Sequence, residues 1–353
     1  MDKVSWGVIG AGGIADRRTL PGMMLAENAR LEAVMEIDAK HAETLKEKYG
    51  AAKAYTSAEE LISDPSIDAV YIASPVRAHF EQAASAALAG KHILLEKPLT
   101  LHIDEGKELL GICEKQGVLI AAGFMMRFHP YHRTLREMVA NGEMGQIVSM
   151  RAQLSCWYPD VQDAWRQSMA ESGGGALMDM GIHCIDLLQY ITRDVARRVT
   201  AYAGTKTFTY DVEDSASVLL EFRGGAYGYV DSNFNVPDNA SEGRLEIYGT
   251  RASALAKGTI SQTGAGECRI IFSENADYDA SQDRTENAGA AGSGGLLSEP
   301  LSNLYTREIE SFGNSLLNGL PLEAPASDAL LAQQIVLCAY QSARENRTVE
   351  IIL

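Results

Sequence analysis

The 353-residue sequence is poor in basic residues, poor in cysteine and free of long hydrophobic runs, and each shortage excludes a class of protein. Lysine and arginine total 31 against 47 aspartates and glutamates, which gives a net charge of −16. Nucleic acids and anionic membrane surfaces are bound through basic patches, so we expect neither as a partner. No apolar run approaches the roughly 20 residues that a membrane-spanning helix needs. The composition predicts a soluble acidic enzyme.

The five cysteines do not form a recognisable pattern. They are widely spaced, odd in number and without a Cys-x-x-Cys motif, so we expect reduced thiols in a cytoplasmic protein. The sequence also enters a β-like run at once, without the charged region, apolar run and cleavage site of a secretory signal. A cytoplasmic location is therefore predicted.

The first part of the chain, 1–123, alternates short apolar runs with longer amphipathic segments. This alternation is typical of βαβ units around a parallel sheet, an α/β fold. Strands are expected at 4–9, 30–36, 68–73, 92–96 and 118–122, and helices near 13–26, 39–49, 58–63, 77–89 and 103–116.

The second part, 124–353, has a different texture and predicts an α+β domain. β-like runs separated by turn residues indicate hairpins and an antiparallel sheet. Strands are expected at 146–156, 197–207, 215–222, 226–234 and 243–248, and helices at 130–141, 174–192, 302–318 and 327–345. The segment 279–300 is rich in small and polar residues and should form an exposed or mobile loop. It could act as a lid, but a plain surface insertion is favoured.

A glycine-rich turn follows the first expected strand. It reads Gly10-x-Gly12-Gly13-Ile14-Ala15, which fits the dinucleotide-binding fingerprint with alanine in place of the last glycine. Gly10 allows the tight turn, Gly12 lets the backbone approach a pyrophosphate, and the next helix offers its N-terminus to the phosphates. The motif predicts a nicotinamide cofactor.

The cofactor is expected to be NAD rather than NADP. Glu36 ends the second strand, where its carboxylate can bind ribose hydroxyls and would repel a 2′-phosphate. Its neighbour Ile37 offers no cation to such a phosphate. Asp38 is expected to cap the following helix instead.

Two further strands end in residues that should face the same crevice. Ser74 and Pro75 end one of them, and His79 follows on a helix, where it could reach the cofactor or serve only as a structural hydrogen-bonding group. Glu96, Lys97 and Pro98 end the next strand, so that a lysine lies at the mouth of the dinucleotide site. This combination suggests hydride transfer.

Asp179 and His183 lie four residues apart in an expected helix and should share one face. A carboxylate beside an imidazole is a usable pair for proton transfer. A metal site would need a third ligand, and Cys184 and Asp186 point elsewhere on the helix, so no metal is expected.

These motifs together resemble the Gfo/Idh/MocA oxidoreductase family, which includes glucose–fructose oxidoreductases and inositol dehydrogenases. The resemblance covers essentially the whole chain. It rests on the glycine-rich turn, Ser74-Pro75, Glu96-Lys97-Pro98, the segment from Gly123 to Pro130, and the segment from Gly175 to Asp186.

The resemblance implies a Rossmann domain followed by a domain with an open, mostly antiparallel sheet, which commonly forms a homo-oligomer interface, so a dimer or tetramer is expected. It implies Lys97 as the catalytic lysine, Asp179 as a substrate-binding aspartate and His183 as the catalytic histidine. It also implies reversible oxidation of a secondary alcohol in a sugar or cyclic polyol to a ketone. His183 can take the proton, Lys97 can stabilise the developing charge on oxygen, and Asp179 can orient the histidine or bind a neighbouring hydroxyl.

Other residues are candidate substrate contacts. Arg127 and His129 follow the last strand of the first domain and should enter the cleft. Trp157, Tyr158, Trp165 and Arg166 precede the helix of Asp179, where aromatic rings would suit the apolar face of a sugar but could equally be core residues. The arginines could bind a carboxylate, a phosphate or neutral hydroxyls.

Three functions fit these residues. The favoured one is an NAD-dependent dehydrogenase acting on a sugar, glycoside or cyclic polyol. The second is a glycoside-processing enzyme in which NAD oxidises a hydroxyl transiently, with no net NADH production. The third is an inactive, NAD-responsive regulator on the same fold, which the presence of Lys97, Asp179 and His183 disfavours.

Overall fold

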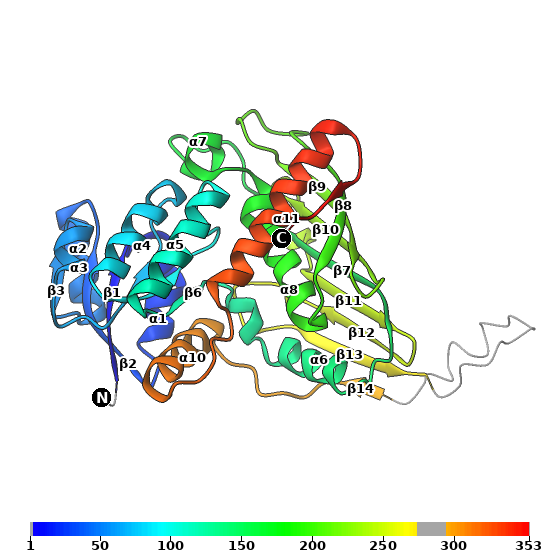
Figure 1. Ribbon diagram of the computed structural model, residues 1–353, viewed down its shortest axis with the longest axis horizontal. Coiled ribbons are helices and arrows are strands. Elements are labelled where there is room, and N and C mark those ends of the chain that lie inside the picture. Colours follow the sequence, from blue (N-terminus) through cyan, green and yellow to red (C-terminus); the bar gives the residue numbers. More distant parts are fainter. Residues whose placement is uncertain (1–2, 274–293, 353) are drawn as a thin grey trace, which may run out of the picture.

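The computed structural model describes residues 3–273 and 294–352 and contains two sheets with helices packed against them (Figure 1). The first sheet has the order β3-β2-β1-β4-β5-β6 and is parallel throughout, which is the order of a dinucleotide-binding fold. Its strands are β1 Val4–Ile9, β2 Ala29–Met35, β3 Lys53–Tyr55, β4 Ala69–Ile72, β5 His92–Leu95 and β6 Ile120–Ala122.

Helices cover both faces of this sheet. One face packs against α3 Ala58–Ile62, α4 His79–Leu88 and α5 Ile103–Gln116. The other face packs against α1 Leu20–Met23, α2 Ala39–Tyr49 and a helix from much later in the chain, α10 Leu304–Asn318. In the core on that side Trp6 and Phe312 are in contact, with ring centroids 5.2 Å apart. The two parts of the chain therefore share a core, and a division at residue 123 stays a prediction.

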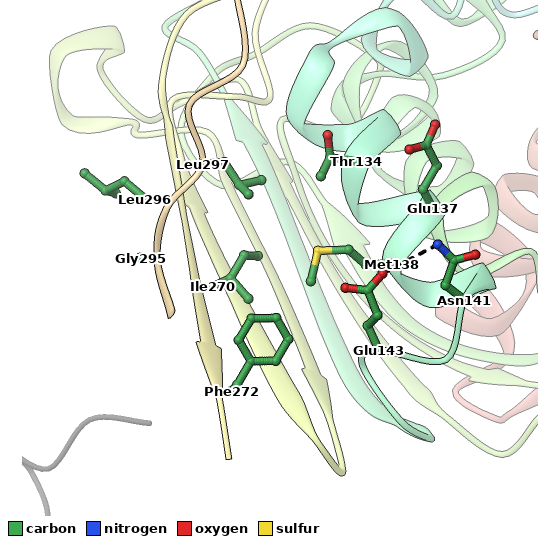
Figure 2. A pocket seen from close by; sticks show the side chains of 10 residues that line it. All are labelled: Thr134, Glu137, Met138, Asn141, Glu143, Ile270, Phe272, Gly295, Leu296 and Leu297. Carbon is green, nitrogen blue, oxygen red and sulfur yellow. Dashed lines mark hydrogen bonds between the residues drawn. The ribbon is translucent and has the colours of Figure 1, made fainter. Parts of the chain in front are cut away.

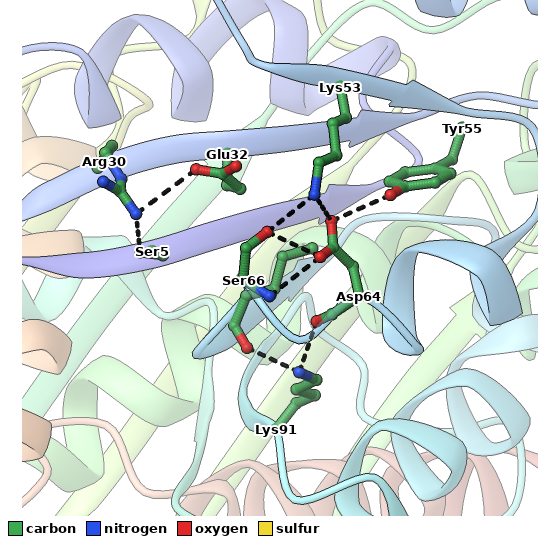
Figure 3. Close-up of polar contacts among 9 residues, drawn as sticks. Ser5, Arg30, Glu32, Lys53, Tyr55, Asp64, Ser66 and Lys91 are labelled. Carbon is green, nitrogen blue, oxygen red and sulfur yellow. Dashed lines mark hydrogen bonds and ion pairs between the residues drawn. The ribbon is translucent and has the colours of Figure 1, made fainter.

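A polar cluster fixes the short edge strand β3, which the sequence did not predict (Figure 3). Asp64 accepts hydrogen bonds from the Lys53 ammonium (2.7 Å), the Tyr55 hydroxyl (3.0 Å) and the Ser66 backbone (3.0 Å). Lys91 donates to the Asp64 carbonyl at 2.8 Å. Burial raises the pKa of the Asp64 carboxyl, but Lys53 and the other donors outweigh it and hold that pKa below its usual value. The cluster ties β3 to the turn before β4.

The second sheet has the order β14-β13-β12-β11-β7-β10-β9-β8-β15. All pairs are antiparallel except β7 with β10, so the mostly antiparallel sheet expected from the resemblance is confirmed. Its strands are β7 Ile147–Ser155, β8 Ala196–Gly204, β9 Ser215–Phe222, β10 Tyr227–Asn233, β11 Arg244–Gly249, β12 Ala252–Lys257, β13 Glu267–Phe272, β14 Gly294–Leu296 and β15 Val349–Glu350. Of the expected loop at 279–300, residues 279–293 lie outside the described part of the chain.

Three helices, α6 Pro130–Ala140, α8 Ile182–Thr192 and α11 Ala326–Glu345, lie on one face of this sheet (Figure 1). Between α6 and the outer strands a hollow of about 370 Å³ remains, and Figure 2 shows Met138, Ile270 and Phe272 among its lining. The opposite face exposes large side chains, including Tyr202, Leu219 and Tyr227.

Short helical segments join these elements around the space between the two sheets. They are η1 Ala15–Thr19, η2 Val76–Ala78, η3 Met125–Phe128, η4 Trp165–Gln167, α7 Met169–Ser172, η5 Leu177–Gly181 and η6 Asp238–Ala240. The helices expected at 13–26 and 174–192 each begin with a π-helical turn, η1 and η5. Such turns occur frequently at functional sites.

Candidate active site

The glycine-rich turn lies at the carboxyl end of β1, against the end of β4. Gly10 has φ +71°, and a Cβ there would come within 2.7 Å of the Ser74 backbone nitrogen. The Glu36 carboxylate accepts a hydrogen bond from the Gly12 amide at 2.5 Å, and a Cβ on Gly12 would lie 2.9 Å from the same carboxylate oxygen. Side chains larger than hydrogen would therefore fill this cradle. The residues present fit a dinucleotide whose pyrophosphate approaches the backbone.

The residues next to this cradle are accessible from solvent or from the main cavity. Ile37 is 85% exposed directly after Glu36. Gly13 has φ +55° with open space around it, and Ile14 lines the main cavity described below. Asp38 caps α2 by accepting from the His41 amide at 2.6 Å, as expected.

His79 joins two of the loops at the carboxyl ends of the strands. One ring nitrogen lies 2.9 Å from the Ser74 carbonyl oxygen and the other 3.0 Å from the Pro98 carbonyl oxygen. Burial lowers the pKa of His79 to about 4, so the ring is neutral at neutral pH and donates to one of these carbonyls. These bonds give His79 a structural role, and because the ring also lines the cavity, its contact with the cofactor stays a prediction.

Lys97 and Asp179 form an ion pair across the space between the two sheets. The Lys97 ammonium, 11% exposed, donates to the Asp179 carboxylate at 2.7 Å and to the Asp179 carbonyl at 2.6 Å. Arg166 lies 3.6 Å from the same carboxylate oxygen. Burial raises the pKa of Asp179, but the charges of Lys97 and Arg166 outweigh it and keep that pKa below its usual value. Asp179 is therefore ionised and holds both cations.

His183 is only 6% exposed, and its Nδ1 has no hydrogen-bond partner within residues 3–273 and 294–352. Its ring meets Phe124 edge to face, with centroids 5.7 Å apart. Burial lowers the pKa of His183 well below its usual value, Lys97 lowers it further, and Asp179 partly opposes them. Among the described residues the Asp179 carboxylate binds the Lys97 ammonium and not His183 Nδ1, so the suggestion that Asp179 orients the histidine stays a prediction.

A cavity of about 630 Å³ opens in front of Lys97 and His183. This volume is in the usual range for a site that binds small molecules. The residues predicted from the sequence that line it are Ile14, Ser74, His79, Glu96, Lys97, Tyr158, Trp165, Arg166, Asp179 and His183. Residues that the sequence did not suggest line it as well: Arg17, Arg18, Met125, Met126, Asp238, Gln262 and Tyr305.

Glu96 lies at the base of this cavity. Its carboxylate accepts from the Tyr71 hydroxyl at 2.6 Å and from the Lys97 backbone at 3.3 Å. Burial raises the pKa of Glu96, and the charge of Lys97 partly offsets that rise. The side chain connects β4 to the loop that carries Lys97.

Arg127 and His129 are placed differently from the expectation. Arg127 is buried away from the cavity lining and pairs with Asp186 and Asp328, on α8 and α11. His129 begins α6, where Nδ1 accepts from the Tyr131 amide at 3.2 Å. A buried arginine with two carboxylate partners is part of the packing, so the cleft positions predicted for both residues are wrong.

Trp157 also lies apart from the cavity lining. It is partly exposed and packs edge to face on Phe208, with centroids 5.2 Å apart. Tyr158, the next residue, packs on Phe234 at 5.1 Å and does line the cavity. Adjacent residues of an extended segment point to opposite sides, so only one of the two rings faces the site.

Two contacts join loops of the first sheet to later parts of the chain. Arg18, after the glycine-rich turn, donates to the Gln262 amide oxygen at 3.2 Å, and Arg77 pairs with Glu171 at 2.5 Å. Arg18 and Gln262 line the cavity, whereas Glu171 lies in α7 beside it.

Two family models match successive parts of the chain. The model described as "Oxidoreductase family, NAD-binding Rossmann fold" matches residues 4–124, and "GFO/IDH/MocA C-terminal domain" matches residues 132–255. Trans-1,2-dihydrobenzene-1,2-diol dehydrogenase of Mus musculus is 31% identical over 238 residues, 67% of this chain and 70% of the relative. Myo-inositol 2-dehydrogenase of Thermotoga maritima is 28% identical over 352 residues, 98% of each.

A solved structure of levoglucosan dehydrogenase in complex with NADH and levoglucosan has the same fold. Its TM-score is 0.87 at 21% identity, and the match covers 99% of this chain and 100% of that one. Among the described residues no helix is long and apolar enough to cross a membrane.

Proposed function

The chain belongs to the GFO/IDH/MocA family of oxidoreductases, and from that membership we propose that it oxidises a secondary hydroxyl of a sugar, glycoside or cyclic polyol to a ketone, reversibly and with NAD. The observation that carries the proposal is the meeting of Lys97, Asp179 and His183 in one cavity beside a dinucleotide cradle.

The residues that would hold the cofactor surround the ends of β1, β2, β4 and β5. Gly10, Gly12, Gly13 and Ile14 would take the pyrophosphate, Glu36 and Ile37 the adenosine ribose, and Ser74, Pro75, His79, Glu96 and Lys97 the nicotinamide end. When bound, the nicotinamide supplies an acceptor for the hydride that leaves the carbinol carbon. Glu36 is a carboxylate with no lysine or arginine beside it in the sequence, and so we propose a preference for NAD over NADP.

Lys97 and His183 act on different atoms of the substrate hydroxyl group, its oxygen and its proton. The Lys97 ammonium donates a hydrogen bond to the substrate oxygen and stabilises the negative charge that develops there. His183 is neutral near pH 7 and accepts the hydroxyl proton on a ring nitrogen. Asp179 keeps the ammonium in place through its 2.7 Å bond and can accept from a neighbouring hydroxyl.

The alternative assignment is that Lys97, and not His183, takes the hydroxyl proton during oxidation. Burial and the charge of Lys97 make the imidazolium of His183 unfavourable, so a proton on it is readily given up. This property suits proton donation in ketone reduction, the reverse direction. The pH–rate profiles of Lys97 and His183 variants separate the two assignments.

The remaining walls suit a polyhydroxylated ring. Trp165 and Tyr158 offer aromatic surfaces to its apolar face, and Arg166, stacked 4.2 Å over the Trp165 ring, offers hydrogen-bond donors. Asp238 and Gln262 add an acceptor and an amide.

The test is an absorbance screen for NADH with the purified chain, NAD and panels of free sugars, glycosides, inositols and sugar acids. We expect NADH from at least one panel, and none from the same substrate with Lys97→Ala. Glycoside consumption without net NADH would favour the transient-oxidation alternative. Binding of NAD with no change in any substrate would contradict the dehydrogenase and favour the regulator.

We also propose a homo-oligomer formed through the second sheet and a cytoplasmic location. The exposed Tyr202, Leu219 and Tyr227 on the sheet face that the helices leave open support the first, since contiguous apolar surface commonly marks an interface. Sedimentation equilibrium with Tyr202→Asp tests it: a dimer or tetramer that dissociates is expected, and a monomeric native protein would contradict it.

A further inference from the structure

A second cavity, of about 610 Å³, lies beside the one that holds Lys97. It is formed mainly by the loop 160–168, with Glu171 of α7 and Tyr210 closing it. Trp165 lines both cavities, so one aromatic side chain lies between them. A ligand in the first cavity that extends past Trp165 would enter the second.

The polar groups of the second cavity are largely engaged with the protein. Asp160 accepts from the Thr209 hydroxyl at 2.8 Å, and Glu171 pairs with Arg77. Gln167 accepts from the Val161 amide at 2.9 Å and donates to the Pro159 carbonyl at 2.6 Å. A ligand would therefore be recognised through surfaces more than through hydrogen bonds.

The surfaces that remain are apolar or aromatic. They are the rings of Trp165 and Tyr210 and the side chain of Val161, which is 49% exposed. Rings of this kind pack on aryl groups and on the apolar faces of sugars. Among the residues that the structure describes, three carboxylates and no lysine or arginine line this cavity, which disfavours an anionic ligand.

We propose that the second cavity is a subsite for the second ring of a glycoside. The sugar ring that is oxidised lies before Lys97, and an uncharged ring on the other side of the glycosidic bond lies against Trp165 and Val161. The inference rests on the proposed function, because it takes the first ring to be the sugar that is oxidised.

Calorimetric titration of the NADH-saturated protein tests the subsite without turnover, because oxidation of a glycoside requires NAD. The probes are matched methyl and phenyl glycosides of glucose, galactose, mannose and xylose, with a disaccharide of the best-bound sugar as a further arm. In at least one pair the phenyl glycoside should bind roughly 2- to 12-fold more tightly than its methyl partner, the range that aromatic contacts provide. A carboxyphenyl glycoside should lose that advantage.

The variant Val161→Glu places a hydrated charge on the apolar wall and should abolish the phenyl advantage while leaving methyl glycoside binding unchanged. Leu88→Glu, an equally large change at an exposed site on α4, should leave both unchanged. A tighter disaccharide that also depends on Val161 would identify the ring as a sugar, and a tighter phenyl glycoside alone would identify it as aryl.

Equal binding of methyl and phenyl glycosides in every pair, or a phenyl advantage that survives Val161→Glu, would overturn the subsite. If free sugars are nevertheless oxidised, only the subsite fails. If no glycoside binds and no sugar yields NADH, the subsite and the proposed function both fail.

Discussion

Replacing Lys97 with methionine removes one positive charge from the cavity and keeps a side chain of similar length. The ammonium now donates two hydrogen bonds, to the Asp179 carboxylate at 2.7 Å and to its carbonyl at 2.6 Å. Removal of a donor aimed at a developing oxyanion costs about 10²–10³-fold in turnover, or ~3–4 kcal/mol. We expect a loss of this size in kcat for the alcohol that the screen identifies.

The same substitution should leave the chain folded. A buried charge that loses its only partner costs about 3–5 kcal/mol, but Asp179 keeps Arg166 at 3.6 Å and is partly exposed. The free energy of unfolding should therefore fall by less than that range. Denaturant titration measures the free energy of unfolding, and calorimetric titration with NAD checks that the folded variant still binds the cofactor. Lys107→Met is the matched control and should change neither activity nor stability measurably, because it removes an exposed lysine of α5 whose ion-pair partner within the described residues is Asp104.

The pH dependence of the residual activity of Lys97→Met gives a second, independent test. The charge of Lys97 lowers the pKa of His183, so its removal should raise that pKa. Alcohol oxidation requires neutral His183 and falls as the pH drops through this pKa. The acid limb of kcat/KM should therefore move to higher pH in the variant. Native turnover in Lys97→Met, or an acid limb that does not move while chemistry limits the rate, would refute the assigned roles.

Three further predictions concern other groups. His183→Ala should lose roughly 10²–10⁴-fold in kcat and lose the acid limb altogether; a variant that keeps the limb and loses only substrate affinity would assign the proton to Lys97. Glu36→Ser with Ile37→Arg should move the ratio of kcat/KM values toward NADP, and equal use of both cofactors by the native chain would contradict the role of Glu36. Burial lowers the pKa of His79 to about 4, so the unfolded chain binds a proton below about pH 6.5 that the folded chain does not. Stability should therefore fall as the pH drops from 6.5 toward 4, by about 3 kcal/mol for this group, and denaturant titrations across that range should show a smaller fall in His79→Asn.

The sequence predicted the parts of the fold that have a strong local pattern. Short local patterns indicate the turn at Gly10, the parallel strands that follow it and the helix of His183. Several strands were not predicted from the sequence. β3 has three residues, and the alternating positions of β12 are alanine, serine and leucine, which carry little hydrophobic signal. β13 ends in Ile270, Ile271 and Phe272, a strand-like run that the sequence analysis did not use.

The site was predictable where one segment carries the chemistry and not where distant segments meet. Lys97 and Asp179 were found through their motifs, yet nothing local indicates that they form a pair. Arg127 follows a strand end as a ligand-binding arginine would, and its partners Asp186 and Asp328 come from elements far along the chain. Tyr305, at the start of α10, and Gln262, after β12, come from far along the chain and carry no sequence signal that identifies them.

The packing of α10 on the first sheet has a consequence for synthesis on the ribosome. Ile309 and Phe312 belong to the core that holds Trp6, and the Thr306 hydroxyl donates to the Gly22 carbonyl at 2.8 Å. The polypeptide that ends near residue 123 thus leaves the exit tunnel with α1 and α2 on this side of its sheet but with the surface under α10 uncovered. At translation rates of roughly 5–20 residues per second, the covering helix follows about 10–40 s later. During that interval the nascent nucleotide-binding half presents an apolar surface to chaperones, and it acquires its final stability only when the chain is nearly complete.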